Sequence, residues 1–182
     1  MGPMERRPAT AEEAKALAHP LRLRILRLCL DEAQTNKQLA DALAKDPGTV
    51  LHHVRTLVDT GFLAAEEVRA GTRGALEKPY RATGKSWTVD VSDHDDRAAV
   101  VLAGLDAFRE EVLEAGGKAI VTQFRLAVRL GKADGDELRR RLDDLAEEFK
   151  DRDDPGGEPY GLYVGLHRRK GRRVRRTGRR SA

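Results

Sequence analysis

Hydrophobic positions recur with a helical period between residues 34 and 63. Two inward stripes have spacings of one, three and four residues, which keep side chains on one face of a helix. Their members are Leu39, Ala40 and Leu43 in the first stripe and Val50, Val54, Leu57 and Val58 in the second. The pattern predicts two short amphipathic helices, 35–43 and 47–60, joined by a tight turn. Such a pair is a helix-turn-helix.

Capping residues mark the ends of these two helices. Thr35 can cap the first helix, and Gln38, three residues later, completes a capping box. Asp46 is a good cap for the second helix, and Pro47 suits its first position, where no backbone N–H donor is needed. The local chemistry therefore predicts the same boundaries as the hydrophobic period.

Further elements are predicted on both sides of this unit. Thr10, with Glu13 as its capping-box partner, begins a helix, and Pro20 opens another. The inward residues of that second helix are Leu21, Ile25, Leu28 and Cys29. Segments 62–68 and 76–83 are typical of strands and are joined by a segment with two glycines, 69–75. A hairpin in this place is the wing of a winged helix.

The pattern changes beyond Trp87. A helix is predicted from about Asp95 to Ala115, ended by two glycines, with an apolar stripe broader than a lone domain needs. The stripe comprises Ala98, Val101, Leu102, Leu105, Phe108, Val112 and Leu113. Alternation over 120–130 and 160–167 predicts two half-buried strands around a helix that Asp134 begins and that ends near Lys150. Their inner faces are predicted to be Phe124, Leu126, Val128 and Leu130, then Leu138, Leu142, Leu145 and Phe149 on the helix, then Tyr160, Leu162, Val164 and Leu166.

The outward face of the helix 47–60 is small, polar or cationic. Opposite the apolar stripe, at 100° per residue, lie Gly48, Thr49, His52, Arg55 and Thr56. A helix with such a face can enter the major groove of DNA. Surface cations usually have no role, but beside such a helix they become candidates for phosphate or minor-groove contacts. These candidates are Arg69, Arg73, Lys78 and Arg81 of the wing, with Thr35, Asn36 and Lys37 at the start of the scaffold helix, where free amides can hold a phosphate.

Charge is divided unevenly along the 182 residues. The net charge is +4, but residues 168–182 contain nine Lys or Arg and no acid, so the rest of the chain is acidic overall. Residues 1–91 are slightly basic and residues 92–167 are acidic, which assigns DNA binding to the first part and to the tail. We expect the tail to be disordered, and to act either as a nonspecific DNA arm or only as a solvated end.

The chain lacks the signs of a membrane or secreted protein. No apolar run approaches the length of a membrane span, about 20 residues, and charges rather than an apolar signal segment follow the Met-Gly-Pro start. The single cysteine, Cys29, excludes an intrachain disulfide and suits a reducing compartment. We therefore expect a cytoplasmic protein that contacts no membrane.

The run from Leu17 to Trp87 resembles the ArsR-type (arsenic-repressor-like) winged-helix transcriptional regulators. Three segments carry the resemblance, in the family's order and spacing: LAHPLRLRILRLC at 17–29, GTVLHHVRTLVDTGFL at 48–63 and EKPYRATGKSW at 77–87. The resemblance implies a homodimer on double-stranded DNA, usually a repressor, in which the helix 95–115 joins the two protomers. Shorter members of the family stop soon after that helix, so the segment 118–167 is a departure.

Pattern and resemblance together predict an α+β protein in four parts. These are a winged helix-turn-helix DNA-binding domain (1–91), a dimerising helix (92–117), a small C-terminal β-α-β module (118–167) and a basic tail (168–182). Dimer geometry would set the spacing of two half-sites in an inverted-repeat operator.

The residues do not support a metal or cofactor site. Many ArsR-type regulators sense metal through a cysteine pair or through a His and acidic set, but Cys29 is alone and His94 lacks its companions. His52 and His53 are adjacent and thus diverge by 100° on a helix, which favours DNA contact for His52 and packing for His53. An organic ligand, a partner or the protein's own abundance are then the regulators to consider.

Two other classes of function stay open at this point. A winged helix can be a protein-interaction module in a larger assembly, and sequence-specific binding to duplex DNA would discriminate the two. An enzyme is disfavoured, because the sequence has no nucleophile motif, phosphate loop or set of metal ligands.

Overall fold

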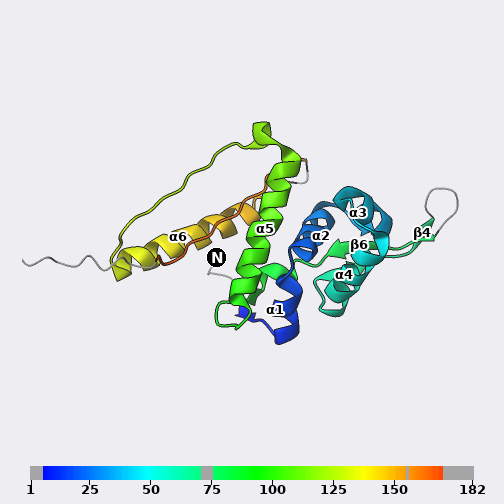
Figure 1. Ribbon diagram of the computed structural model, residues 1–182, viewed down its shortest axis with the longest axis horizontal. Helices are drawn as coiled ribbons and strands as arrows, with labels where there is room; N and C mark the ends of the chain where they lie inside the picture. Colours follow the sequence, from blue (N-terminus) through cyan, green and yellow to red (C-terminus); the bar gives the residue numbers. More distant parts are fainter. Residues whose placement is uncertain (1–5, 71–75, 155, 170–182) are drawn as a thin grey trace, which may run out of the picture.

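The computed structural model describes residues 6–70, 76–154 and 156–169. Arg73 of the predicted wing and residues 170–182 of the predicted tail lie outside these ranges. The fold is α+β, as predicted (Figure 1). In chain order the elements are β1 (Arg7–Pro8), α1 (Ala11–Leu17), α2 (Pro20–Asp31), β2 (Gln34–Thr35), α3 (Asn36–Leu43), α4 (Pro47–Asp59), β3 (Leu63–Ala65), β4 (Arg69–Ala70), β5 (Leu76–Glu77), β6 (Pro79–Ala82), the 3-10 helix η2 (Lys85–Trp87), β7 (Val89–Asp90), α5 (Arg97–Ala115), the 3-10 helix η3 (Gly117–Ala119) and α6 (Lys132–Lys150).

The hydrophobic core lies where α2, α3 and α4 meet the start of β3. Ile25, Leu39, Val54 and Leu57 are completely buried there, and Phe62 closes the core from the end of α4. Each such side chain contributes about 1.5 to 3 kcal/mol by its removal from water. Both predicted stripes of the helix-turn-helix therefore face the same interior.

Helices α1 and α3 begin where the capping residues predict. Thr10 Oγ1 accepts from the amide of Glu13 at 3.2 Å, and the Glu13 carboxylate accepts from the amide of Thr10 at 2.9 Å. The same reciprocal pair is made by Thr35 and Gln38 at the start of α3. The sequence analysis missed the cap of α2: His19 Nδ1 accepts from the amide of Leu21 at 3.2 Å.

The strands among the described residues form three small sheets. β6 lies between β2 and β3 and is antiparallel to both, with Leu63 opposite Ala82 and Gln34 opposite Tyr80. β4 and β5 form a separate ribbon, and β1 pairs in parallel with β7. The predicted strand 76–83 is thus divided into β5 and β6, whereas the predicted strand 62–68 contains only β3, and β4 falls in the predicted connecting segment 69–75. Pro79 explains one interruption, because proline has no N–H to donate to the ladder.

The long helix α5 packs on α1 and α2 through small residues. Ala103 and Ala107 are each 4% exposed, and their size lets the helices approach closely. The apolar stripe predicted for this helix remains largely on its outer side, where Leu102 is 59% exposed and Leu113 is 61% exposed. Gly116, with φ of 79°, ends the helix as predicted.

The C-terminal part is only partly as predicted. Helix α6 is present and begins two residues before Asp134. The strands predicted over 120–130 and 160–167 are wrong for the described residues, because neither segment pairs with a strand. Alternation predicts an extended backbone, but a strand also needs a neighbouring backbone to hydrogen-bond. Figure 1 shows both segments extended and running from α5 toward the far end of α6.

The inner faces predicted for this module are also largely exposed. Phe124 is 87% exposed and Leu162 75%, while Leu145 and Phe149 of α6 are 47% and 58% exposed. The predicted core of the module is therefore wrong for a single chain. Tyr163, on the face of segment 160–167 predicted to point outward, is instead half-buried: its ring stacks on Phe108 of α5, with centroids 5.7 Å apart.

Candidate nucleic-acid interface

Helices α3 and α4 are held in a fixed relation by their connecting turn. Ala44 ends α3 in the left-handed conformation, with φ of 49°. Asp46 Oδ1 then accepts from the amides of Gly48 and Thr49 at 2.9 and 3.0 Å, which satisfies two free donors at the start of α4. Asn36 Nδ2 donates to the Pro47 carbonyl at 3.0 Å and ties the two helix starts together.

The outward face of α4 is the one predicted from the helical period. Gly48, Thr49, His52 and Arg55 are exposed, whereas Thr56 is half-buried. The Thr56 hydroxyl donates to the His52 carbonyl at 3.1 Å. In the described ranges no carboxylate forms an ion pair with Arg55, so its guanidinium is available to a partner molecule.

His53 faces the other way and packs as predicted. It is 8% exposed, its ring centroid lies 4.4 Å from that of His19, and Arg22 Nη1 lies 3.5 Å from its Nδ1. Burial, reinforced by His19, Arg22 and His52, lowers the pKa of His53 to about 4. His53 is therefore neutral near pH 7, and it supports α4 from behind.

The three residues predicted at the start of α3 have different surroundings. Lys37 is exposed. Thr35 is buried and occupied by its capping box, and the Oδ1 atom of Asn36 is buried without a hydrogen-bond partner in the described structure. Through their side chains, Thr35 and Asn36 thus hold the turn in place, and any contact of theirs with DNA stays a prediction.

The cations predicted for the wing differ in whether a carboxylate pairs with them. Arg69 Nε lies 3.8 Å from Glu77, its partner across the β4–β5 ribbon, and Arg81 Nε contacts Glu66 at 2.5 Å. Lys78 is exposed. Arg73 lies outside the described residues.

One candidate was missed in the sequence analysis. Lys45 is exposed in the turn between α3 and α4, directly before the cap of α4. The sequence does contain a signal for Lys45. It is a cation directly before the cap Asp46, at the start of the helix that carries the base-reading candidates.

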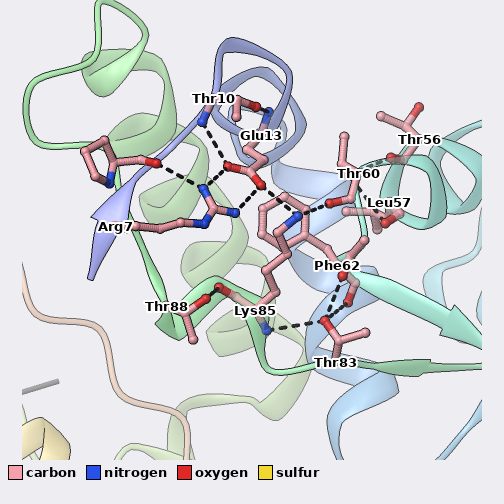
Figure 2. Close-up of polar contacts among 12 residues, drawn as sticks. Arg7, Thr10, Glu13, Thr56, Leu57, Thr60, Phe62, Thr83, Lys85 and Thr88 are labelled. Carbon is pink, nitrogen blue, oxygen red and sulfur yellow. Dashed lines mark hydrogen bonds and ion pairs between the residues drawn. The ribbon is translucent and has the colours of Figure 1, made fainter. Parts of the chain in front are cut away.

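A polar cluster that the sequence analysis also missed anchors the C-terminal end of α4 (Figure 2). Lys85 Nζ donates to the Thr60 carbonyl at 2.5 Å and lies 2.7 Å from the Glu13 carboxylate. Arg7 binds the same carboxylate with both of its terminal nitrogens, at 2.5 and 2.8 Å. These bonds, led by Arg7, hold the pKa of Glu13 far below its usual range. A cation at a helix C-terminus is favourable, so the cluster joins α1, β1 and α4.

The single thiol is buried, as predicted. Cys29 is completely buried, and burial raises its pKa to about 11, which keeps it in the unreactive thiol form. Among the described residues no group of three or more His, Cys, Asp or Glu could hold a metal ion. No helix in the described ranges is both long and apolar enough to cross a membrane.

Comparisons with known proteins are consistent with this domain. Residues 17–65 match a family model described as a helix-turn-helix domain. No curated protein matches the chain at a significant level. The solved structures that match the chain include two distantly similar proteins. A double mutant of ZitR from Lactococcus lactis in its apo form is 17% identical, with 72% of this chain and 83% of that chain covered and a TM-score of 0.34. The transcriptional regulator SlyA is 14% identical, with 72% and 75% covered and a TM-score of 0.32.

The family match and the geometry concern the same residues. The matched range begins at the end of α1 and ends in β3, and the strands that follow add the antiparallel sheet and the β4–β5 ribbon. The chain therefore contains a helix-turn-helix domain of the winged type.

Proposed function

We propose that this protein is a homodimeric, sequence-specific DNA-binding transcriptional regulator of the cytoplasm. The observation that carries the proposal is the outward face of α4. It presents two small residues, Gly48 and Thr49, followed by His52 and Arg55, all of them exposed. Arginine donates two parallel hydrogen bonds to guanine, and small residues let a helix approach the floor of the major groove.

Rigid support of α4 favours this function. Asp46 secures the start of the helix and Lys85 its end, while His53 and the core hold its inner side. A reading helix must hold its side chains in register with the base pairs, so fixed ends favour specific recognition. Around it, Lys37, Lys45 and Lys78 are exposed and could contact the phosphates.

The outer side of α5 favours a homodimer. Val101, Leu102, Leu105 and Leu113 are between 47% and 61% exposed, and they form a continuous apolar stripe. A two-fold dimer joined there would present two α4 helices to an inverted repeat. Its half-sites would lie about one helical turn of DNA, or a multiple of it, apart.

We further propose that the protein represses and belongs to the ArsR-type regulators without being a metal sensor. Repression is proposed because segment 17–87 resembles that mostly repressing family. The inert environment of Cys29 favours a signal other than a thiophilic metal, such as an organic effector.

The test is selection of duplexes from a random pool by the full-length protein, followed by fluorescence anisotropy at fixed salt. We expect an inverted repeat bound by two chains, more tightly than a scrambled duplex of the same composition by at least about 1,000-fold. Equal affinity for both duplexes would overturn the proposal. Capture of a polypeptide on the α4 face instead would favour an interaction module, and turnover of a substrate would favour an enzyme.

A further inference from the structure

The single chain exposes far more surface than a compact protein of its size. Its accessible surface is 14785 Å². A compact monomer of 20.2 kDa exposes about 8,800 Å². Obligate homodimer interfaces bury about 2,000 to 5,000 Å² in total.

The excess apolar surface is concentrated after residue 100. Among the described residues beyond that point, the buried apolar residues are Ala103 and Ala107 alone. The exposed ones include Phe124 at 87%, Leu126 at 69% and Leu162 at 75%. Their alternation along 120–130 and 160–167 is the pattern of strands with one buried face. A segment that stays in water buries neither of its faces, so this alternation indicates that another surface covers the apolar face.

The backbones of both segments are also unpaired. In the described ranges, the amides of residues 121–130 and 160–167 donate no hydrogen bond to another backbone or side chain. Extended backbone with free N–H and C=O groups is a template for pairing with another strand. Both segments run from α5 toward the far end of α6 (Figure 1), and within the described part of the chain each leaves the amides of its backbone free along that path.

Contacts with α2 and α5 place segment 160–167 beside the dimer surface proposed above. The Tyr163 ring stacks on Phe108, and its hydroxyl donates to the Val101 carbonyl at 3.3 Å. Arg27 donates to the Tyr160 carbonyl at 2.6 Å. The segment 160–167 is thereby fixed next to the outer stripe of α5, and the apolar surface of α5 continues into it.

We propose that segments 120–130 and 160–167 pair with the same segments of a second copy of this chain. The paired segments form an intermolecular sheet, and the α6 helices cover its apolar face. The inference extends the homodimer of the proposed function, and it assigns the C-terminal module to the completion of that dimer.

Charge favours a second copy over a charged partner such as nucleic acid. On the outer side of α6 the charges neutralise one another in pairs, with Arg139 3.0 Å from Asp143 and Arg140 2.8 Å from Asp144. Residues 92–167 are acidic overall and therefore repel nucleic acid, whereas two identical chains can join through apolar and backbone contacts.

The test compares Phe124→Asp with Gln123→Asp in the full-length protein by sedimentation equilibrium. Both residues are exposed in the single chain and both variants add one negative charge, but only Phe124 lies on the apolar face. Two phenylalanines are lost per dimer, so we expect Phe124→Asp to raise the dimer dissociation constant by about 100-fold. Gln123→Asp should leave it within about threefold of wild type.

Hydrogen exchange supplies a direct readout of the sheet. We expect the amides of residues 121–129 to be protected in the wild-type protein, more so as protein concentration rises, and to exchange rapidly in Phe124→Asp. Rapid exchange in the wild type at every concentration would overturn the inference.

A third variant, Leu105→Asp, separates the inference from the proposed function. If Leu105→Asp dissociates the dimer while Phe124→Asp dimerises like wild type, the intermolecular sheet is excluded and the α5 dimer stands. If the wild type is a monomer at micromolar concentration, the inference fails, and the duplex selection still tests specific DNA binding independently.

Discussion

At the scale of single residues, His52 and His53 are neighbours in sequence with opposite surroundings. His52 is exposed on the outer face of α4, and His53 is buried against His19 and Arg22. A rotation of 100° per residue is enough to separate a candidate for base contact from a packing residue. Arg55, one turn beyond His52, shares the outer face.

Replacing His52 or Arg55 by alanine should weaken operator binding without unfolding the protein. If each makes a base contact, the expected loss is about 1 to 3 kcal/mol of binding free energy. Arg139→Ala is the matched control for Arg55→Ala, because it removes an arginine charge from α6. It should bind the operator like wild type. Anisotropy titrations on operator and scrambled duplexes measure the loss. Wild-type affinity in both α4 variants would show that another face of α4 meets the DNA.

His53 should make stability depend on pH in the acidic range. Its pKa is about 4 in the folded protein and 6.5 in an unperturbed chain, so the unfolded state binds a proton more readily. The contribution is fully present above pH 6.5, falls as the pH drops below that value and stops falling near pH 4. The expected loss across this window is about 3 kcal/mol.

Urea unfolding at pH 7 and at pH 4.5 measures this dependence, with His53→Gln as the comparison. The variant should lose less stability over that interval than the wild type, although carboxylates contribute to both. The same loss in the two proteins would mean that protonation of His53 is tolerated in the folded state.

At the scale of elements, α4 is secured at its start by its own cap and at its end by a side chain from elsewhere in the fold. Asp46 binds its first amides, and Lys85 binds the carbonyl of Thr60 while it is itself held by Glu13. Glu13 therefore has two tasks, because it is also the capping-box partner of Thr10. Through this carboxylate, the start of α1 is connected to the end of the candidate reading helix.

Removing the cap of α4 should lower the free energy of unfolding more than removing an exposed negative charge from α3 does. Asp46→Ala leaves the amides of Gly48 and Thr49 without an acceptor, at an expected cost of about 1 kcal/mol in the free energy of unfolding. Asp41→Ala removes the same charge from an exposed position in α3, and we expect it to be neutral or slightly stabilising. Denaturant midpoints at one pH compare the two. Equal midpoints would mean that solvent replaces the cap without cost.

At the scale of the whole molecule, charge is separated along the chain. The last fifteen residues contain nine cations and no acid, and the rest of the sequence is acidic overall. Phosphate neutralisation by such a segment releases counterions, so its effect on binding does not depend on base sequence and falls steeply with salt.

Deleting residues 168–182 should therefore flatten the salt dependence of DNA binding. We expect affinity for random duplexes to fall more than affinity for the operator, so that the ratio of the two rises as total affinity falls. Salt titrations of full-length and truncated protein on both duplexes test this. Identical slopes would show that the tail contacts no phosphate, because it is solvated or bound to the acidic surface of its own dimer.

The sequence alone determined the helix-turn-helix, because its signals are local. Capping boxes at Thr10 and Thr35, the cap and proline at 46–47 and the helical period of Val50, Val54 and Leu57 act within one or two turns of chain. The same period separated His52 from His53 and placed Cys29 in the core. Whether the outer face reads DNA is a property of the partner and stays a proposal.

Only the tertiary structure decided the features that depend on distant segments. The link from Lys85 to Thr60 and Glu13 joins three separate parts of the chain, and no local sequence pattern predicts it. The segments 120–130 and 160–167 show the opposite case: their alternation correctly indicated extended backbone, but not a strand. A period of two is a property of one segment, whereas a sheet also needs a second backbone within hydrogen-bonding reach, and that neighbour is absent from the described part of the single chain.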